Sequence, residues 1–157
     1  MGGAHQRCTI ILAAGSGGTS AGLILGTKIF DVNARVVSIN TCDDRAHFLQ
    51  AIGGICEDTI AEYHLDIDFN RDRDIEIIDG YVGRGSGVSQ PSELAMICEV
   101  AQTEGIFLDP VYTGKAFFGM VEELKHDPKC FGERIIFIHT GGIFGLLPKA
   151  GELEPYL

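Results

Sequence analysis

The stretch CTIILAAGSGGTSAGLIL, residues 8–25, predicts a buried strand, a glycine turn and the start of a helix. Residues 9–12 form an uninterrupted β-branched and aliphatic run, which is typical of a parallel strand buried on both faces. Three glycines among residues 15–18 allow a sharp turn and let backbone N–H groups approach a ligand closely. Because free amides and a helix dipole then point at one place, the stretch predicts an anion site, most often for a phosphate.

The glycine turn alone does not identify the anion. A dinucleotide fingerprint that begins at Gly15 would need Gly or Ala at position 20, where this chain has Ser20. The next predicted strand ends at Asn40, and no Asp or Glu stands at its tip to bind a ribose. A triphosphate loop is excluded, because no Gly-Lys-Ser/Thr follows the glycines. A tight strand-to-helix connection without a ligand stays open as the structural alternative.

The composition indicates one α/β domain that binds neither nucleic acid nor a membrane. The chain has 157 residues, of which 45% are hydrophobic, and 21 glycines, so it can bury one sizeable core. A net charge of −10 without a basic run argues against a nucleic-acid surface. No apolar stretch reaches the length of a membrane span, and residues 1–7 lack a signal peptide's apolar segment, so an intracellular location is expected. Five widely spaced cysteines predict free thiols, most of them buried, and no zinc site.

The rest of the chain continues the alternation of strands and helices. Further strands are predicted at residues 35–40, 75–79 and 134–139, and helices at residues 19–31, 45–65, 91–104 and 116–126. This order predicts an α/β protein with a mostly parallel sheet, whose functional residues lie in loops at the strand ends.

Three segments carry more specific predictions. Thr41 or Asp43 is expected to cap the helix at residues 45–65, which the pair Gly53-Gly54 interrupts. The charge-dense residues 66–74 are expected to form a solvated loop without a metal, because the spacing of a calcium loop is missing. Residues 145–157, rich in Pro and Gly, are expected to form an exposed tail.

Four polar residues lie near the ends of the predicted elements. Two of them are candidates for function, and the other two are expected to have structural roles. Thr140 follows a buried strand, at the carboxyl end where open α/β sheets bind ligands. Tyr112 lies in a loop that Pro110 stiffens, with packing in the core as its alternative role. His139 is expected to be a core histidine satisfied by the backbone, and Lys115 to have a structural or solvent-facing role.

Three phrases of the sequence resemble a known enzyme family. They are Ala-Gly-Ser-Gly-Gly-Thr-x-Ala-Gly-Leu at residues 14–23, Thr-Glu-Gly-x-x-Leu-Asp-Pro-Val-Tyr-Thr-Gly-Lys-Ala at residues 103–116 and Phe-Ile-His-Thr-Gly-Gly-x-Phe-Gly-Leu at residues 137–146. Together they resemble the D-cysteine desulfhydrase and 1-aminocyclopropane-1-carboxylate deaminase family, which uses pyridoxal 5'-phosphate. The resemblance runs from about Thr9 to Leu147 and implies a three-layer sandwich with the tryptophan-synthase-β-like fold, here in part.

The resemblance assigns a role to each candidate residue. The implied cofactor contacts are Gly15, Ser16, Gly17, Gly18 and Thr19 on the phosphate, with Thr113, Thr140 and Gly141 further along the chain. Thr140 matches the hydroxyl residue that faces the pyridine nitrogen, and Tyr112 matches an active-site tyrosine that assists the leaving thiol. Thr113 and Thr140 favour the desulfhydrase branch, in which D-cysteine and water give pyruvate, hydrogen sulfide and ammonia. The deaminase reaction is the close alternative.

The chain also departs from the family pattern. Ser86 stands where the family has a second active-site tyrosine, and none of the five lysines matches the motif of the lysine that forms the Schiff base. Residues 1–157 therefore resemble the C-terminal portion of the catalytic domain, without the N-terminal region that carries this lysine. A half-domain that binds the cofactor or another phosphate without chemistry is the second alternative. The family implies a small amino-acid substrate, a homodimer for the full-length enzyme, and a cytoplasmic location, or a mitochondrial one if the missing half carries a targeting segment.

Overall fold

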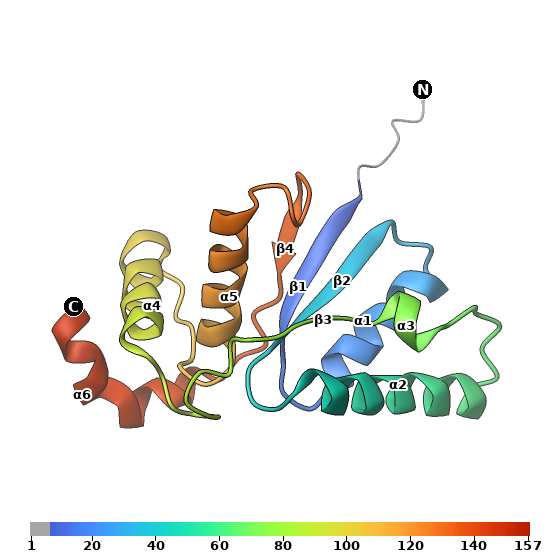
Figure 1. The fold of residues 1–157 in the computed structure, drawn as a ribbon, viewed down its shortest axis with the longest axis horizontal. Helices are drawn as coiled ribbons and strands as arrows, with labels where there is room; N and C mark the ends of the chain where they lie inside the picture. Colours follow the sequence, from blue (N-terminus) through green and yellow to red (C-terminus); the bar gives the residue numbers. More distant parts are fainter. Residues whose placement is uncertain (1–6) are drawn as a thin grey trace.

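The computed structural model describes residues 7–157 as a parallel four-stranded sheet with helices on both faces (Figure 1). The strands are β1 (Cys8–Ala14), β2 (Ala34–Asn40), β3 (Glu76–Ile78) and β4 (Ile135–Phe137), arranged in the order β3-β2-β1-β4. All three pairings are parallel, so the predicted α/β class with a mostly parallel sheet is confirmed. The prediction that residues 1–7 lack a signal peptide concerns, except for Arg7, residues outside the described part of the chain.

The helices form two layers around the sheet. They are α1 (Gly18–Ile29), α2 (Arg45–Glu62), α3 (Arg71–Asp74), α4 (Pro91–Glu104), α5 (Thr113–His126) and α6 (Ala150–Leu153), with 3-10 helices at Ile143–Lys149 and Glu154–Tyr156. Helices α1 and α2 cover one face, α5 covers the other, and α4 packs on the outside of α5 (Figure 1). This is the expected three-layer sandwich.

Strand β1 is the centre of the fold because both of its faces are buried. Leu12 packs towards α1 and α2, whereas Ile11 packs towards α5, and each side chain is 0% exposed. Ile11 lies beside Val37 of β2 and Phe137 of β4 in the ladder. An uninterrupted apolar run suits such a strand, since neither face meets water. The carboxyl ends of β1, β2 and β4 therefore meet at one edge, where the glycine turn begins.

The prediction of an interrupted helix at residues 45–65 is wrong, because α2 runs through both glycines. A Cβ at Gly53 would lie 2.6 Å from Nε of Arg71, so this glycine makes room for a side chain that crosses the helix. Arg71 there donates hydrogen bonds to Glu57 and Gln50. The predicted cap is also corrected: Asp44 caps α2 by accepting a 2.7 Å hydrogen bond from the backbone N–H of His47.

Two predicted loops contain helical structure. Within residues 66–74, Asn70 caps the short helix α3, so this charged segment is only partly a solvated loop. The C-terminal segment is not simply an exposed tail, because Leu153 of α6 is 9% exposed and packs with Leu94 and Ile97 of α4. The sequence signals of both segments are short, and their helices depend on contacts with the rest of the fold.

The cysteines are free, as predicted, but only two of the five are buried, Cys56 and Cys98. Among the described residues, no helix is both long enough and apolar enough to span a bilayer.

Candidate functional site

The turn after β1 exposes backbone amides at the beginning of α1. Gly17 adopts a left-handed conformation with φ of 85°, and its carbonyl accepts the first helical hydrogen bond, from Ala21 N–H at 2.9 Å. Within the described residues no side chain caps this helix, and its first turn carries no acidic residue. The amides of Gly18 and Thr19 thus have no carboxylate competing with an anion for them, which is the arrangement that binds phosphate at helix N-termini.

Two residues that follow β2 contact carbonyl groups at the start of this turn. The hydroxyl of Thr41 donates to the carbonyl of Ala14 at 3.0 Å, and Thr41 is 0% exposed. The Sγ atom of Cys42 lies 3.6 Å from the carbonyl of Gly15, and burial followed by the charge of Asp43 raises the pKa of this thiol. Because these groups bind carbonyls, they orient the turn and leave its amides free.

Gly15 lies against the ring of Tyr112. A Cβ at Gly15 would lie 2.9 Å from Cε1 and 3.2 Å from Cδ1 of that ring. A side chain at position 15 would therefore displace the tyrosine. This contact joins the turn after β1 to the loop before α5, which is almost 100 residues further along the chain.

A hollow of about 270 Å³ lies at this edge of the sheet. Its walls are Ala13, Gly15, Ser16, Thr19, Tyr112 and Thr140. The glycine turn, the tyrosine loop and the end of β4 thus line one concave surface, as the sequence predicted. Of the sequence candidates, Gly17 and Gly18 lie in the turn and the helix start without lining the hollow, and Thr113 and Gly141 do not line it either.

Thr113 has a different environment from the one the resemblance implies. It is 1% exposed, and its hydroxyl accepts from the backbone N–H of Asp109 at 2.8 Å and donates to Asp109 Oδ1 at 2.7 Å. The hydroxyl is therefore engaged within the loop and does not face the hollow. The sequence placed Thr113 next to Tyr112, but it did not indicate that the Thr113 hydroxyl would bond with Asp109.

His139 and the following turn are held by the backbone. Nε2 of His139 lies 2.8 Å from the carbonyl of Phe107, and Gly141 N–H donates to Nδ1 at 3.1 Å. A carbonyl only accepts and an amide N–H only donates, so this geometry requires the proton on Nε2. The predicted backbone partners of His139 are present, but the residue is exposed and not part of the core. Thr140 is consequently held between two fixed residues.

Lys115 has a structural role in the loop that follows β3. Its side chain is 0% exposed, and its Nζ donates to the carbonyls of Val82 at 2.6 Å, Gly85 at 3.3 Å and Val88 at 2.9 Å. The carboxylate of Glu93, itself 1% exposed, lies 3.8 Å from the ammonium group. One buried cation thereby anchors the glycine-rich loop to α5. None of the five lysines lines the hollow, and all of them lie in the described chain.

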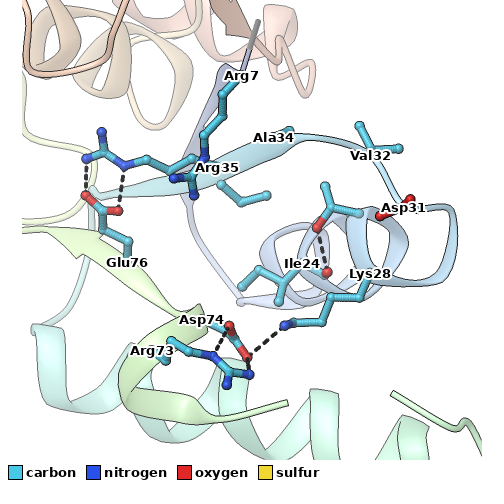
Figure 2. Close-up of a pocket in the computed structure, with 12 residues that line it drawn as sticks. Arg7, Ile24, Lys28, Asp31, Val32, Ala34, Arg35, Arg73, Asp74 and Glu76 are labelled. Atoms are coloured by element: carbon cyan, nitrogen blue, oxygen red, sulfur yellow. Dashed lines mark hydrogen bonds and ion pairs between the residues drawn. The ribbon is translucent and has the colours of Figure 1, made fainter. Parts of the chain in front are cut away.

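A second and larger hollow, of about 590 Å³, lies at the opposite edge of the sheet, at the beginnings of the strands (Figure 2). Arg35 makes a bidentate ion pair with Glu76 and donates a hydrogen bond to the carbonyl of Cys130 at 2.7 Å. Arg73 and Lys28 both bind the carboxylate of Asp74, each at 3.0 Å (Figure 2). These three cations are already neutralised by protein carboxylates, whereas Arg7, the fourth lining cation, makes no ion pair within the described residues. The hollow therefore offers an anion less than its size and its number of cations suggest.

Titratable groups elsewhere do not gather into a metal site. Within residues 7–157 no set of three or more His, Cys, Asp and Glu side chains is placed to hold an ion. Tyr81 donates to Glu123 at 2.8 Å, and burial together with this carboxylate raises the pKa of its phenol far above the ordinary value. Tyr81 is thus an engaged side chain of the glycine loop, and Tyr112 is the tyrosine that reaches the hollow.

The fold and the hollow define an α/β protein with a glycine turn and an uncapped helix N-terminus at the carboxyl edge of a parallel sheet. The chain belongs to the family of pyridoxal-phosphate dependent enzymes, whose model matches residues 3–141. It is 38% identical to the bifunctional D-cysteine desulfhydrase/1-aminocyclopropane-1-carboxylate deaminase of Arabidopsis thaliana, a mitochondrial protein, over 92% of this chain and 34% of that protein. It is 32% identical to the D-cysteine desulfhydrase of Klebsiella pneumoniae, over 89% of this chain and 42% of that protein.

A solved structure supports the same assignment at the level of the fold. The crystal structure of an ACC deaminase homologue superposes with a TM-score of 0.82 at 35% sequence identity, over 95% of this chain and 44% of the other. The predicted family and its tryptophan-synthase-β-like fold are confirmed by these likenesses. The chain spans less than half the length of the relatives that it matches.

Proposed function

We propose that the chain carries the cofactor-contacting part of a pyridoxal-phosphate dependent lyase that converts D-cysteine and water to pyruvate, hydrogen sulfide and ammonia. The observation that carries this proposal is the single hollow in which the glycine turn meets Tyr112 and Thr140. Pyridoxal phosphate, when bound, supplies the electron sink that makes the α-proton of an amino acid acidic.

The phosphate end of the hollow fits the cofactor. The uncapped first turn of α1 and the hydroxyls of Ser16 and Thr19 provide donors for a phosphate, with no carboxylate among the lining residues. Gly15 leaves room for the Tyr112 ring, because a Cβ there would lie 2.9 Å from it, and Gly17 lets the turn pack on the buried Ile52, because a Cβ there would lie 3.0 Å from that side chain. We therefore assign Gly15, Ser16, Gly17, Gly18 and Thr19 to the phosphate.

The other end of the hollow carries two neutral hydroxyl groups. Thr140, beyond the end of β4, is the proposed partner of the ring nitrogen, with Gly141 beside it. A neutral hydroxyl does not force a proton onto that nitrogen, which moderates electron withdrawal and suits elimination of a β-leaving group. Tyr112 is 40% exposed at the opening, where its phenol can hold or protonate the departing sulfur.

Two alternatives have support of their own. Relatives of this chain are named both as D-cysteine desulfhydrases and as 1-aminocyclopropane-1-carboxylate deaminases, so the deaminase reaction is the first. The second is a module that binds the cofactor without chemistry, because no lysine lines the hollow. In the first case and in the main proposal, the chain contributes the C-terminal portion of the catalytic domain to a homodimer. We propose the cytoplasm as its compartment, or the mitochondrion on the example of the Arabidopsis relative.

The purified chain with added pyridoxal phosphate tests the proposal. Equilibrium dialysis and absorbance measure retention of the cofactor, and sulfide from D-cysteine and ammonia from 1-aminocyclopropane-1-carboxylate measure the chemistry above a cofactor-only blank. We expect retention with a free-aldehyde spectrum and sulfide release that prefers D- over L-cysteine. Tyr112→Phe should lower sulfide release at least about tenfold, whereas Tyr63→Phe, an exposed residue after α2, should not change it.

Each other outcome has a defined meaning. Ammonia without sulfide would assign the deaminase reaction, and retention of the cofactor without either product would assign to residues 1–157 by themselves a binding role without chemistry. If the chain retains no cofactor, the proposal is wrong.

A further inference from the structure

We propose that Asp109 is a positioning residue that holds Tyr112 and the turn carrying Thr140 as one unit across the hollow. The inference rests on the proposed function for its catalytic meaning, but not for its structural content. Asp109 does not line the hollow, and it acts through the two residues that do. The sequence motif placed it beside Tyr112 without indicating what its carboxylate contacts.

One side of the carboxylate fixes the tyrosine loop. Its Oδ2 accepts from the backbone N–H groups of Val111 at 2.8 Å and Tyr112 at 2.9 Å. Its Oδ1 accepts from the N–H of Thr113 at 2.7 Å and from the Thr113 hydroxyl at 2.7 Å. Asp109 is only 2% exposed, so water cannot substitute for these donors. Four hydrogen bonds to one buried carboxylate leave the backbone of Tyr112 a single orientation.

The other side of the carboxylate packs on the turn after β4. A Cβ at Gly142 would lie 2.7 Å from Cγ and 2.9 Å from Oδ1 of Asp109, so the turn approaches the carboxylate as closely as a glycine permits. A second tie joins the same two segments, since His139 binds the carbonyl of Phe107 at 2.8 Å. Thr140 lies between these two contacts. The tyrosine loop and the threonine turn therefore cannot move independently.

This coupling acts most directly on one end of the hollow, and it meets the other end through the contact between the Tyr112 ring and Gly15. The phosphate end is built by the turn after β1 and by α1, which are held by Thr41 and by the helix itself. Displacing Asp109 would shift Tyr112 and Thr140, the groups that face the ring and the substrate, and leave Ser16 and Thr19 in place. The expected result is a cofactor bound with similar affinity but in a changed orientation. A residue that merely stabilises the fold would lower both properties together.

Two pairs of variants separate these cases. Thr113→Val removes the hydroxyl that bonds to Asp109, and Thr113→Ser keeps it. Gly142→Ala places a methyl group on the carboxylate and also an Ala at φ of 90°, so it displaces the turn and Asp109 together, whereas Gly145→Ala makes only ordinary contacts with Pro110 and Asp109, at 3.6 Å or more. Asp109→Asn replaces one acceptor with a donor that faces N–H groups. Urea midpoints establish that each variant is folded, and the Thr113 and Gly142 pairs carry the test if Asp109→Asn does not fold.

The first readout needs no cofactor. The aromatic NMR signals of Tyr112, assigned with Tyr112→Phe, should shift in Thr113→Val and in Gly142→Ala but stay in place in Thr113→Ser and Gly145→Ala. The long-range case is Gly142→Ala, because this residue lies 30 positions from Tyr112 in the chain. Unchanged Tyr112 signals in folded Thr113→Val and Gly142→Ala would overturn the inference, whether or not the chain binds the cofactor.

The second readout is the induced circular dichroism of bound pyridoxal phosphate. Because small misplacements at a site have large effects, we expect Thr113→Val to reduce the signal per bound cofactor at least about threefold, with Kd changed less than about twofold. Thr113→Ser should restore the signal. Equal losses of signal and affinity would show a general structural role and overturn the positioning role. Failure of the unaltered chain to bind the cofactor would instead contradict the proposed function and leave the NMR result to decide the coupling.

Discussion

The two edges of the sheet carry hollows of opposite character. The hollow at the carboxyl edge is the smaller, about 270 Å³, and is lined by glycine, alanine, hydroxyl groups and one tyrosine. The hollow at the amino edge is about 590 Å³ and is rich in charged side chains (Figure 2). Size and charge would favour the second as a ligand site, but three of its four lining cations, Lys28, Arg35 and Arg73, are bound to carboxylates. The comparison teaches that the proposed anion site follows from donors without partners and not from volume.

Buried and half-buried cations also differ between the two edges. Lys115, near the carboxyl edge, holds backbone carbonyls and thereby shapes a loop. At the amino edge, Arg35 joins β2 to β3 through Glu76, and Lys28 joins the end of α1 to α3 through Asp74, so these cations hold carboxylates. Neither arrangement leaves a cation free for a cofactor phosphate, which is why the backbone amides of the glycine turn are the proposed phosphate donors.

The largest expected effect tests the carboxyl edge. Lys115→Met would leave the buried carboxylate of Glu93 without a cation and three carbonyls without a donor, so the free energy of unfolding should fall by about 3–5 kcal/mol. Urea denaturation followed by far-UV circular dichroism measures this. Lys125→Met is the control on the same helix, because Lys125 is exposed and pairs only with Glu122, and its effect should stay below about 1 kcal/mol. Equal midpoints for the two variants would refute the anchoring role.

The next effect addresses the glycine turn. Gly17→Ala forces a side chain into a left-handed conformation, with its Cβ 3.0 Å from Ile52, and should cost about 1–2 kcal/mol of unfolding free energy. Since the amides beside it are the proposed phosphate donors, affinity for pyridoxal phosphate should fall at least about tenfold. A fluorescence titration measures the affinity. Gly22→Ala, where a Cβ has no neighbour within 4 Å, should keep the affinity and raise helix stability by up to about 1 kcal/mol.

A smaller effect tests whether the amino edge is only structural. Arg35→Leu removes the ion pair with Glu76 and the bond to the carbonyl of Cys130, and should lower the unfolding free energy by about 1–2 kcal/mol after allowance for partial exposure. Affinity for pyridoxal phosphate should not change, because the two hollows lie at opposite edges of the sheet. A loss of cofactor affinity in folded Arg35→Leu would contradict the division of roles between the edges.

Local signals in the sequence predicted most of the fold. The apolar run of β1, the glycine turn, and α4 with Pro91 at its start and Gly105 at its end all follow from residues close together in the chain. Gly105 ends α4 in a left-handed conformation, which is the reason a glycine stands there. These elements need no distant partner, so their pattern is readable without the structure.

Features that depend on distant contacts could not be read from the sequence. Gly53 lies inside α2, where the side chain of Arg71 packs against it, and Leu153 is buried because it packs against α4. At the site, Tyr112 and Thr140 were predicted as site residues from the sequence motifs that contain them. The Asp109 contacts that link them depend on how two loops pack together. Local pattern and the family resemblance thus named five residues that line the hollow, but also Gly17, Gly18, Thr113 and Gly141, which do not line it. Tertiary structure determines which candidates reach the hollow and what holds them there.

The smallest expected effect is a pH dependence at the amino edge. Burial raises the pKa of Asp74, but hydrogen bonds from Arg73, the backbone of Asn70 and Lys28 outweigh it and lower the pKa to about 2, from an ordinary value of 3.8. A lowered pKa in the folded state means that the ionised carboxylate stabilises the fold above about pH 4, and that this contribution disappears as the pH falls towards 2. Urea midpoints between pH 5 and pH 2 should therefore fall less steeply for Asp74→Asn than for the unaltered chain. Parallel slopes would mean that Asp74 has the same pKa in the folded and unfolded states. Its pairing with Arg73 and Lys28 would then not explain why these cations are unavailable to an anion.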